Sequence, residues 1–83
     1  MGARARGPRA QHAPAYRRLC RLLRAWRSEA GLTQRALAAK LKKPYSYVWK
    51  VEAGERRIDP IEFAAWCRAC AVTPAEAMEQ LDA

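Results

Sequence analysis

The chain has 83 residues, of which 51% are hydrophobic, and a formal net charge of +8 at pH 7. This length fits one domain with a small core, and no apolar run reaches the roughly 20 residues that a membrane-crossing helix needs, so we expect a soluble protein. Fifteen of the 16 basic residues precede Ile58, whereas five of the eight acidic residues follow it. Such an asymmetry indicates a polyanion as the partner of the basic part, with the acidic end turned away from it. The alternative is a basic protein whose charges are merely solvated.

Residues 1–14, MGARARGPRAQHAP, contain Gly, Pro, Ala and Arg without any apolar period. We therefore expect a disordered basic arm and no secretory signal. Arg4, Arg6 and Arg9 could follow phosphates or enter a minor groove, and a solvated tail explains them equally well. The single histidine, His12, lies in this arm and receives no ligand role. Residues 15–83 form the predicted domain.

A first helix is expected over residues 15–30, with Gly31 ending it. Its apolar stripe has helical spacing, can be extended by Tyr16, and consists of Leu19, Leu22, Leu23 and Trp26. The face expected to meet solvent carries Arg17, Arg18, Arg21 and Arg24.

Residues 33–57 predict two short helices around a tight corner. Thr33 can cap the first helix, and Pro44 disfavours the right-handed helical conformation at Lys43, so the chain should turn at Lys42 and Lys43. A second helix follows over residues 45–53, with Val48 and Val51 pointing inward by its period and Gly54 ending it. The outward positions are Tyr45, Ser46, Trp49, Lys50 and Ala53. A pair of this size is typical of a helix-turn-helix unit, whose second helix enters the DNA major groove.

The run GLTQ…LA…L…PYSYVWKVEAGERR resembles the phage repressor and Cro family, also called the xenobiotic-response-element family, over residues 19–78. The resemblance implies a compact all-α domain of five helices, similar to lambda repressor. It also implies a transcriptional regulator that binds specific double-stranded DNA sequences, with repression as the expected role. Two positions depart from the family pattern, because Lys42 replaces the usual Gly at the corner and Trp49 replaces a small polar residue.

The resemblance also implies roles for individual side chains. Contacts to base edges are expected from Tyr45, Ser46, Trp49 and Lys50. Lys50 can donate to guanine O6 or N7, and the two aromatic rings can contact thymine methyl groups. Contacts to DNA phosphates are expected from Gln34, Arg35, Lys43, Arg56 and Arg57, with the two adjacent arginines able to bind phosphate bidentately. Arg27 and Glu52 occupy the positions of the ion pair between the first and third helices of the family.

Two more helices are expected after this loop. Asp59 can cap the fourth, with Pro60 at its first position and Glu62 in its first turn, and Thr73 can cap the fifth, with Glu76 at the capping-box position. The fourth helix has an apolar face at helical spacing, formed by Phe63, Trp66, Cys67 and Cys70. Candidate homodimer contacts at the C-terminal helix are Met78 and Leu81, together with Tyr47. Simple closure of the core is the alternative role of these residues.

The reactive residues predict neither a metal site nor an enzyme. Cys67 and Cys70 form a C-x-x-C, but together with Cys20 and His12 they do not supply four ligands of sound geometry. We expect the three thiols to behave as small apolar core residues in a reducing cytoplasm, bacterial or of a phage-infected host. The chain has no glycine-rich phosphate loop and no carboxylate pair facing a common cleft, so we expect no catalytic centre, cofactor or small-molecule ligand.

Exposed Tyr45 and Trp49 leave a second hypothesis open. Aromatic side chains on an outward helix face are typical of protein-interaction hot spots, so the same fold could serve as an adaptor, such as an antitoxin or a coactivator-like protein. RNA binding through stacked aromatic rings is a third hypothesis.

Overall fold

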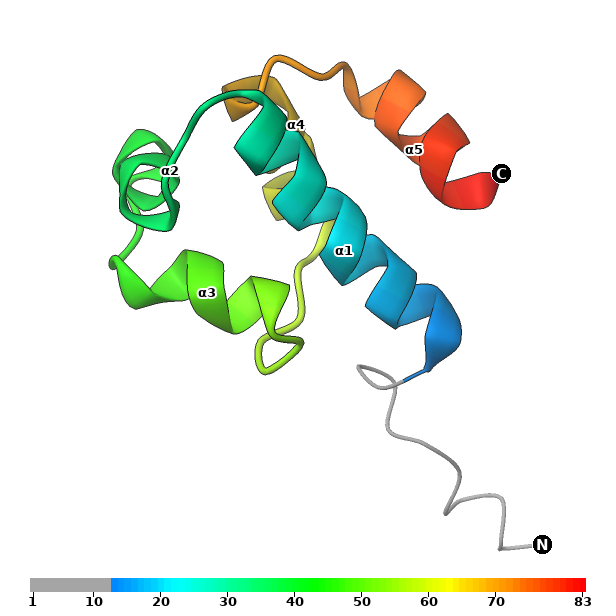
Figure 1. Ribbon diagram of the computed structural model, residues 1–83, viewed down its shortest axis with the longest axis horizontal. Coiled ribbons are helices and arrows are strands. Elements are labelled where there is room, and N and C mark those ends of the chain that lie inside the picture. The colour runs from blue at the N-terminus through cyan, green and yellow to red at the C-terminus, as the bar shows by residue number, and fades with distance from the viewer. Residues whose placement is uncertain (1–12) are drawn as a thin grey trace, which may run out of the picture.

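The computed structural model describes residues 13–83, and the expected arm falls largely on residues 1–12, which lie outside the described part. Within the described residues the chain forms α-helices and no strand (Figure 1). The five helices are α1 (Pro14–Glu29), α2 (Gln34–Leu41), α3 (Ser46–Glu52), α4 (Pro60–Ala69) and α5 (Pro74–Asp82). The all-α, five-helix prediction is confirmed. Across residues 13–83, no helix is both long and apolar enough to cross a membrane.

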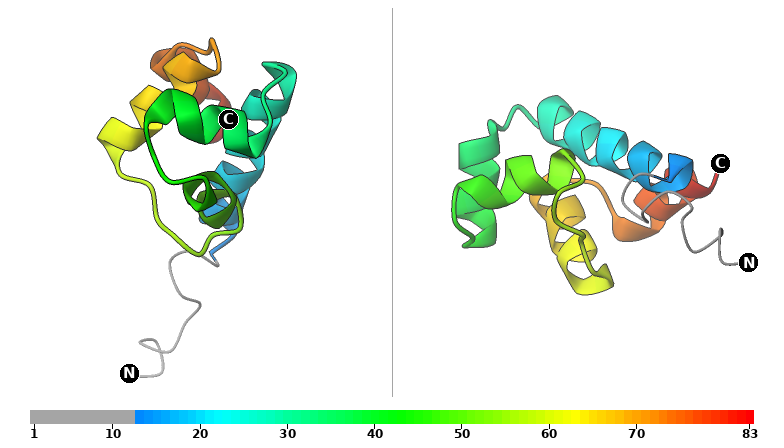
Figure 2. Two further views of the ribbon diagram at one scale, coloured as in Figure 1. Left: turned by 90° about the vertical axis from the view of Figure 1, so that its left-hand side faces the viewer. Right: turned by 90° about the horizontal axis from the view of Figure 1, so that it is seen from below.

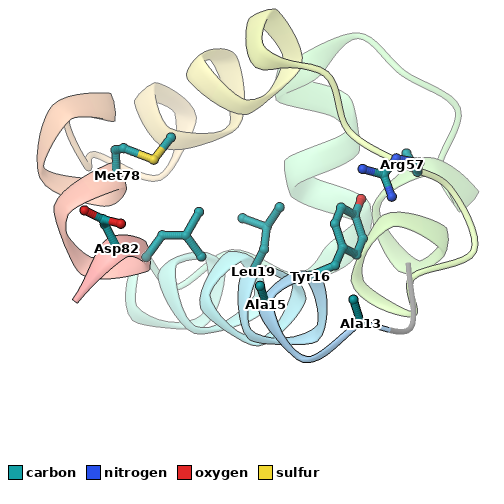
Figure 3. A pocket seen from close by; sticks show the side chains of 8 residues that line it. Ala13, Ala15, Tyr16, Leu19, Arg57, Met78 and Asp82 are labelled. Atoms are coloured by element: carbon teal, nitrogen blue, oxygen red, sulfur yellow. The ribbon is translucent and has the colours of Figure 1, made fainter. Parts of the chain in front are cut away.

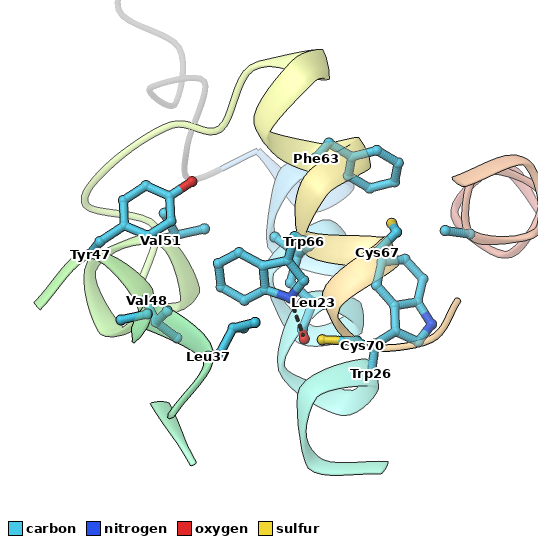
Figure 4. Close-up of a cluster of buried hydrophobic side chains, with 12 residues drawn as sticks. Leu23, Trp26, Leu37, Tyr47, Val48, Val51, Phe63, Trp66, Cys67 and Cys70 are labelled. Carbon is cyan, nitrogen blue, oxygen red and sulfur yellow. Dashed lines mark hydrogen bonds between the residues drawn. The ribbon is translucent and has the colours of Figure 1, made fainter. Parts of the chain in front are cut away.

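The core lies where the longest helix, α1, packs against α3 and α4. Helix α2 packs against α3 and α4, and α5 packs against α1 and α4 (Figures 1 and 2). Trp66 of α4 is fully buried in this core, and its indole Nε1 donates to the carbonyl oxygen of Leu23 in α1 at 3.2 Å (Figure 4). Leu37, Val48 and Val51 are also 0% exposed. The helix-turn-helix pair is therefore backed by side chains from both α1 and α4.

Three helices begin at side chains that accept backbone N–H groups, as the sequence predicts. The Thr33 hydroxyl accepts from Ala36 N–H at 3.0 Å, and Asp59 and Glu62 form a full capping box, with bonds of 2.8 and 3.1 Å. Thr73 accepts from Glu76 N–H at 3.2 Å. Within residues 13–83 the reciprocal bond from Thr73 N–H to the Glu76 carboxylate does not form, so half of that expected capping box is present.

The first four helices share one way of ending. In each, a residue with positive φ donates its N–H three residues back and the next residue donates five residues back, which is the Schellman arrangement. Glycine supplies the left-handed conformation after α1 and α3, at Gly31 and Gly54. After α2 and α4 the same conformation is adopted by Lys42, with φ 57°, and Ala71, with φ 62°. A residue with a Cβ pays about 1–2 kcal/mol for this conformation, so the corner at Lys42 carries local strain.

The helix expected over residues 45–53 is one residue shorter at each end in the structure, where α3 runs from Ser46 to Glu52. The Pro44 carbonyl accepts from Tyr47 N–H at 2.9 Å, so Pro44 and Tyr45 form a separate turn that leads into α3. The exposed Tyr45 therefore stands at the very start of α3.

Arg18 contacts α5 instead of lying on the solvent face expected for α1. Its Nε donates to the Leu81 carbonyl at 3.2 Å and its Nη2 donates to the Gln80 carbonyl at 2.6 Å. These carbonyls lie in the last turn of α5, where backbone acceptors lack helical partners. Trp26 adds a bond from its Nε1 to the Gln80 Oε1 at 3.0 Å. The C-terminal helix is thus attached to α1 by polar as well as apolar contacts.

The three cysteines are free and buried, as expected of core residues. Burial is the main cause that raises the pKa of Cys67 to about 11, so this thiol stays neutral near pH 7. In residues 13–83 no group of three or more potential ligands is placed to hold a metal ion.

Candidate nucleic-acid interface

The α3 helix separates its side chains into a buried and an outer set. Val48 and Val51 are fully buried, whereas Tyr45 is 64% exposed and Trp49 is 39% exposed. Lys50 is exposed and Ser46 is half-buried. All four side chains expected at base edges therefore lie outside the core.

Tyr47 does not belong to the outer set. It is 5% exposed, and its ring lies 6.2 Å from the ring of Trp66. The prediction that Tyr47 takes part in a homodimer contact is therefore wrong, because its ring is part of the core.

A buried polar network fixes α3 to the helices around it. Arg27 Nε lies 2.6 Å from Glu52 Oε2 and Arg27 Nη2 lies 3.1 Å from Oε1, so the ion pair expected between α1 and α3 is present. The third nitrogen of Arg27, Nη1, donates to the Leu32 carbonyl at 2.9 Å. The side chains of Arg27 and Glu52 are only 11% and 5% exposed. All buried side-chain nitrogen and oxygen atoms among residues 13–83 have hydrogen-bond partners.

Gln34 belongs to the same network. Its Nε2 donates to Glu52 Oε1 at 3.0 Å, which joins the start of α2 to the end of α3. We expected Gln34 to contact a DNA phosphate, and a primary amide has two N–H donors, so one of them remains for that role. No sequence pattern indicated the bond from Gln34 to Glu52, which joins residues 18 positions apart.

The expected phosphate contacts are held close to aromatic rings. Arg35 Cζ lies 5.0 Å from the centre of the Tyr45 ring, and Arg57 Cζ lies 4.5 Å from that of Tyr16. The Tyr47 ring has Arg56 Cζ at 4.9 Å and Lys43 Nζ at 5.2 Å from its centre. Cation–ring contacts of this kind restrict long side chains while leaving N–H donors free. Helical spacing could not reveal them, because each ring lies on a different element from its cation.

The guanidinium fork of Arg56 is bound to a carboxylate of α4. Its Nη1 and Nη2 donate to the two carboxylate oxygens of Glu62 at 3.1 and 3.0 Å, and Lys43 Nζ lies 3.5 Å from Glu62 Oε2. The hydrogen bond from Arg56 is the main cause that holds the pKa of Glu62 below its usual value. In the free protein the Arg56 fork is therefore bound to Glu62, and its contact with a DNA phosphate stays a prediction.

Two hollows lie beside these elements. One, of about 310 Å³, adjoins the start of α3 and is lined by Lys43, Pro44, Ser46, Tyr47, Lys50 and Arg56. The other, of about 470 Å³, lies between α1 and α5 and is largely apolar (Figure 3). Tyr16, Leu19, Met78 and Leu81 contribute to its lining. The first hollow is basic and is lined in part by α3 side chains, whereas no α3 side chain lines the second, whose one basic lining residue is Arg57.

Comparison with known proteins gives two findings. A family model described as a helix-turn-helix domain matches residues 18–80. The solved structure of an XRE-family like protein from Pseudomonas syringae pv. tomato str. DC3000 is 39% identical, and the match covers 99% of this chain and 95% of that chain with a TM-score of 0.82. No curated protein matches the chain.

Proposed function

Because the chain belongs to the helix-turn-helix family, in its Cro and repressor form, we propose that it recognises a specific double-stranded DNA sequence through α3 and acts as a repressor. Family membership supports the broader statement that the protein is a DNA-binding regulator. The observation that carries the finer proposal is the outer set on α3, Tyr45, Ser46, Trp49 and Lys50, on a helix fixed by the Arg27–Glu52 pair.

In the proposed complex, the outer set on α3 lies in the major groove. Lys50 donates to guanine O6 or N7, the Ser46 hydroxyl bonds to a base edge, and the rings of Tyr45 and Trp49 contact thymine methyl groups. Phosphates on either side of the groove are contacted by Gln34, Arg35, Lys43, Arg56 and Arg57. Phosphate contacts fix the position of the protein on the duplex, and base contacts supply the sequence preference.

We extend the proposal to a homodimer formed through the C-terminal helix. Met78 is 50% exposed, and with Leu81 it borders the apolar hollow between α1 and α5. A second copy that covers this surface would remove apolar area from water. Two copies of α3 would then read half-sites about one helical turn, roughly 34 Å, apart.

Replacing Lys50 and Arg57 separately distinguishes base readout from phosphate binding. Lys50→Ala should cost about 1–3 kcal/mol on the preferred duplex and little on other duplexes, because it removes a donor to one base. Arg57→Ala should weaken every duplex by the same factor and reduce the slope of log K against log salt by about one, because phosphates carry no sequence information. The measurement is a salt titration of each variant on duplexes selected from a random pool and on unselected ones.

A protein-binding adaptor is the second candidate, since Tyr45 and Trp49 are large exposed aromatic residues. An adaptor would select no duplex from the pool and would lose little affinity for its partner as the salt concentration rises. Those two results together would exclude the regulator and favour the adaptor.

A further inference from the structure

The carboxylate of Glu62 occupies the place that a phosphate would take between two of the expected phosphate contacts. It lies in the first turn of α4 and accepts both terminal nitrogens of Arg56, at 3.1 and 3.0 Å, with Lys43 Nζ at 3.5 Å. Two parallel N–H···O bonds from one guanidinium are also the arrangement in which arginine binds a phosphate. Glu62 and a DNA phosphate would therefore compete for the same two donor groups of Arg56.

We propose that Glu62 is an internal substitute for a DNA phosphate, which binds Arg56 and Lys43 in the free protein and lowers the affinity for duplex DNA of any sequence. This inference rests on the proposed function, because it assumes that these two cations meet the DNA backbone. It assigns an effect on DNA affinity to a residue of α4, outside the helix-turn-helix pair.

Exposure supports competition between Glu62 and DNA. The side chains of Arg56 and Lys43 are 43% and 36% exposed, whereas that of Glu62 is 15% exposed, so the carboxylate lies behind cations that the solvent can reach. The same two cations line the basic hollow, together with Ser46 and Lys50. A phosphate that approaches Arg56 and Lys43 from this hollow would also be repelled by the Glu62 carboxylate, which already binds both cations. Replacing the carboxylate by a neutral group removes that repulsion and frees the Arg56 fork.

The side chains of Arg56 and Lys43 should keep their positions when the negative charge of Glu62 is removed. Arg56 and Lys43 both lie over the Tyr47 ring, at 4.9 and 5.2 Å from its centre, and Tyr47 is itself buried. Glu62 also accepts the backbone N–H of Asp59 at 3.1 Å, a bond that glutamine can make equally well at this position of a capping box. The loss of charge should therefore outweigh the loss of an anchor in Glu62→Gln.

The test compares Glu62→Gln with the unaltered protein on a labelled duplex of random sequence. At about 0.1 M salt we expect about fivefold tighter binding, the size of a strong exposed ion pair, and about the same gain on a selected duplex. The gain should shrink as salt rises, and it should be smaller when Arg56→Ala is already present. Glu76→Gln is the matched control, because Glu76 occupies the equivalent position after the Thr73 cap of α5 and is exposed. It should change the affinity less than twofold by the same reasoning, because no pair with Arg56 or Lys43 is lost.

Thermal melting of each variant shows whether it is folded. Glu62→Ala, which loses the capping contact as well as the charge, should also bind the duplex of random sequence more tightly than the unaltered protein. Unchanged or weaker binding by folded Glu62→Gln, while the unaltered protein binds duplex DNA, would overturn the inference and leave the proposed function standing. If the unaltered protein binds no duplex at all, the proposed function fails and the inference fails with it.

Discussion

Replacement of Glu52 by glutamine should lower the free energy of unfolding by about 3 kcal/mol, because it leaves the Arg27 guanidinium buried without a counter-charge. Glu52 accepts two bonds from Arg27 and one from Gln34, so three helices meet at this carboxylate. Its side chain is 5% exposed and that of Arg27 is 11% exposed, which leaves little water to replace the lost partner. DNA binding should weaken as well, because α3 loses the contacts that set its orientation.

Urea unfolding and thermal melting measure this effect. For a domain of this size, 3 kcal/mol corresponds to a fall in Tm of roughly 12–24 °C. Glu55→Gln is the matched control, since Glu55 is exposed and lies three residues after the end of α3. It should shift the stability by no more than about 0.5 kcal/mol. An unchanged Tm together with unchanged DNA affinity in Glu52→Gln would show that the network does not position α3.

Trp66→Ala should cost about 4 kcal/mol of stability, because it empties the centre of the core. Trp66 is 0% exposed and contacts α1 through the bond from its Nε1 to the Leu23 carbonyl (Figure 4). It also lies next to the Tyr47 ring, on which Arg56 and Lys43 rest. Urea unfolding checks the size of the effect, and Trp66→Phe, which keeps most of the apolar volume, should cost less than half as much.

Trp49→Ala is the matched variant for Trp66→Ala, because it removes a tryptophan that lies outside the core. Trp49 is 39% exposed and Trp66 is 0% exposed, so removal of the Trp49 ring should cost much less stability than removal of the Trp66 ring. Equal destabilisation by Trp66→Ala and Trp49→Ala would contradict the placement of Trp49 outside the core.

Most of the fold could be predicted because its signals are local. Thr33, Asp59 and Thr73 each combine a capping side chain with the start of an apolar period, and each does cap a helix. Gly31 and Gly54 mark the ends of α1 and α3 by their positive φ. The bonds that attach Arg18 to the last turn of α5 could not be predicted, because they join residues more than 60 positions apart.

The candidate site was predicted less completely. The period of α3 correctly placed Val48 and Val51 inside, but α3 spans only seven residues, and the core extends round it far enough to include Tyr47. The Arg27–Glu52 pair came from the family resemblance, since two residues 25 positions apart on different helices have no relation that helical spacing reveals. The sequence placed Glu62 only in the first turn of the fourth helix. Its contact with Lys43 could not be predicted, because it depends on how α4 packs beside the corner of the helix-turn-helix pair.

The most direct test of DNA recognition by α3 is a map of backbone amide chemical shifts during titration with a duplex selected from a random pool. We expect the largest changes at residues 45–53 and at Arg56 and Arg57, with small changes at Met78 and Leu81 beyond those caused by dimer formation. Changes concentrated along the hollow between α1 and α5, with α3 unaffected, would contradict the central claim.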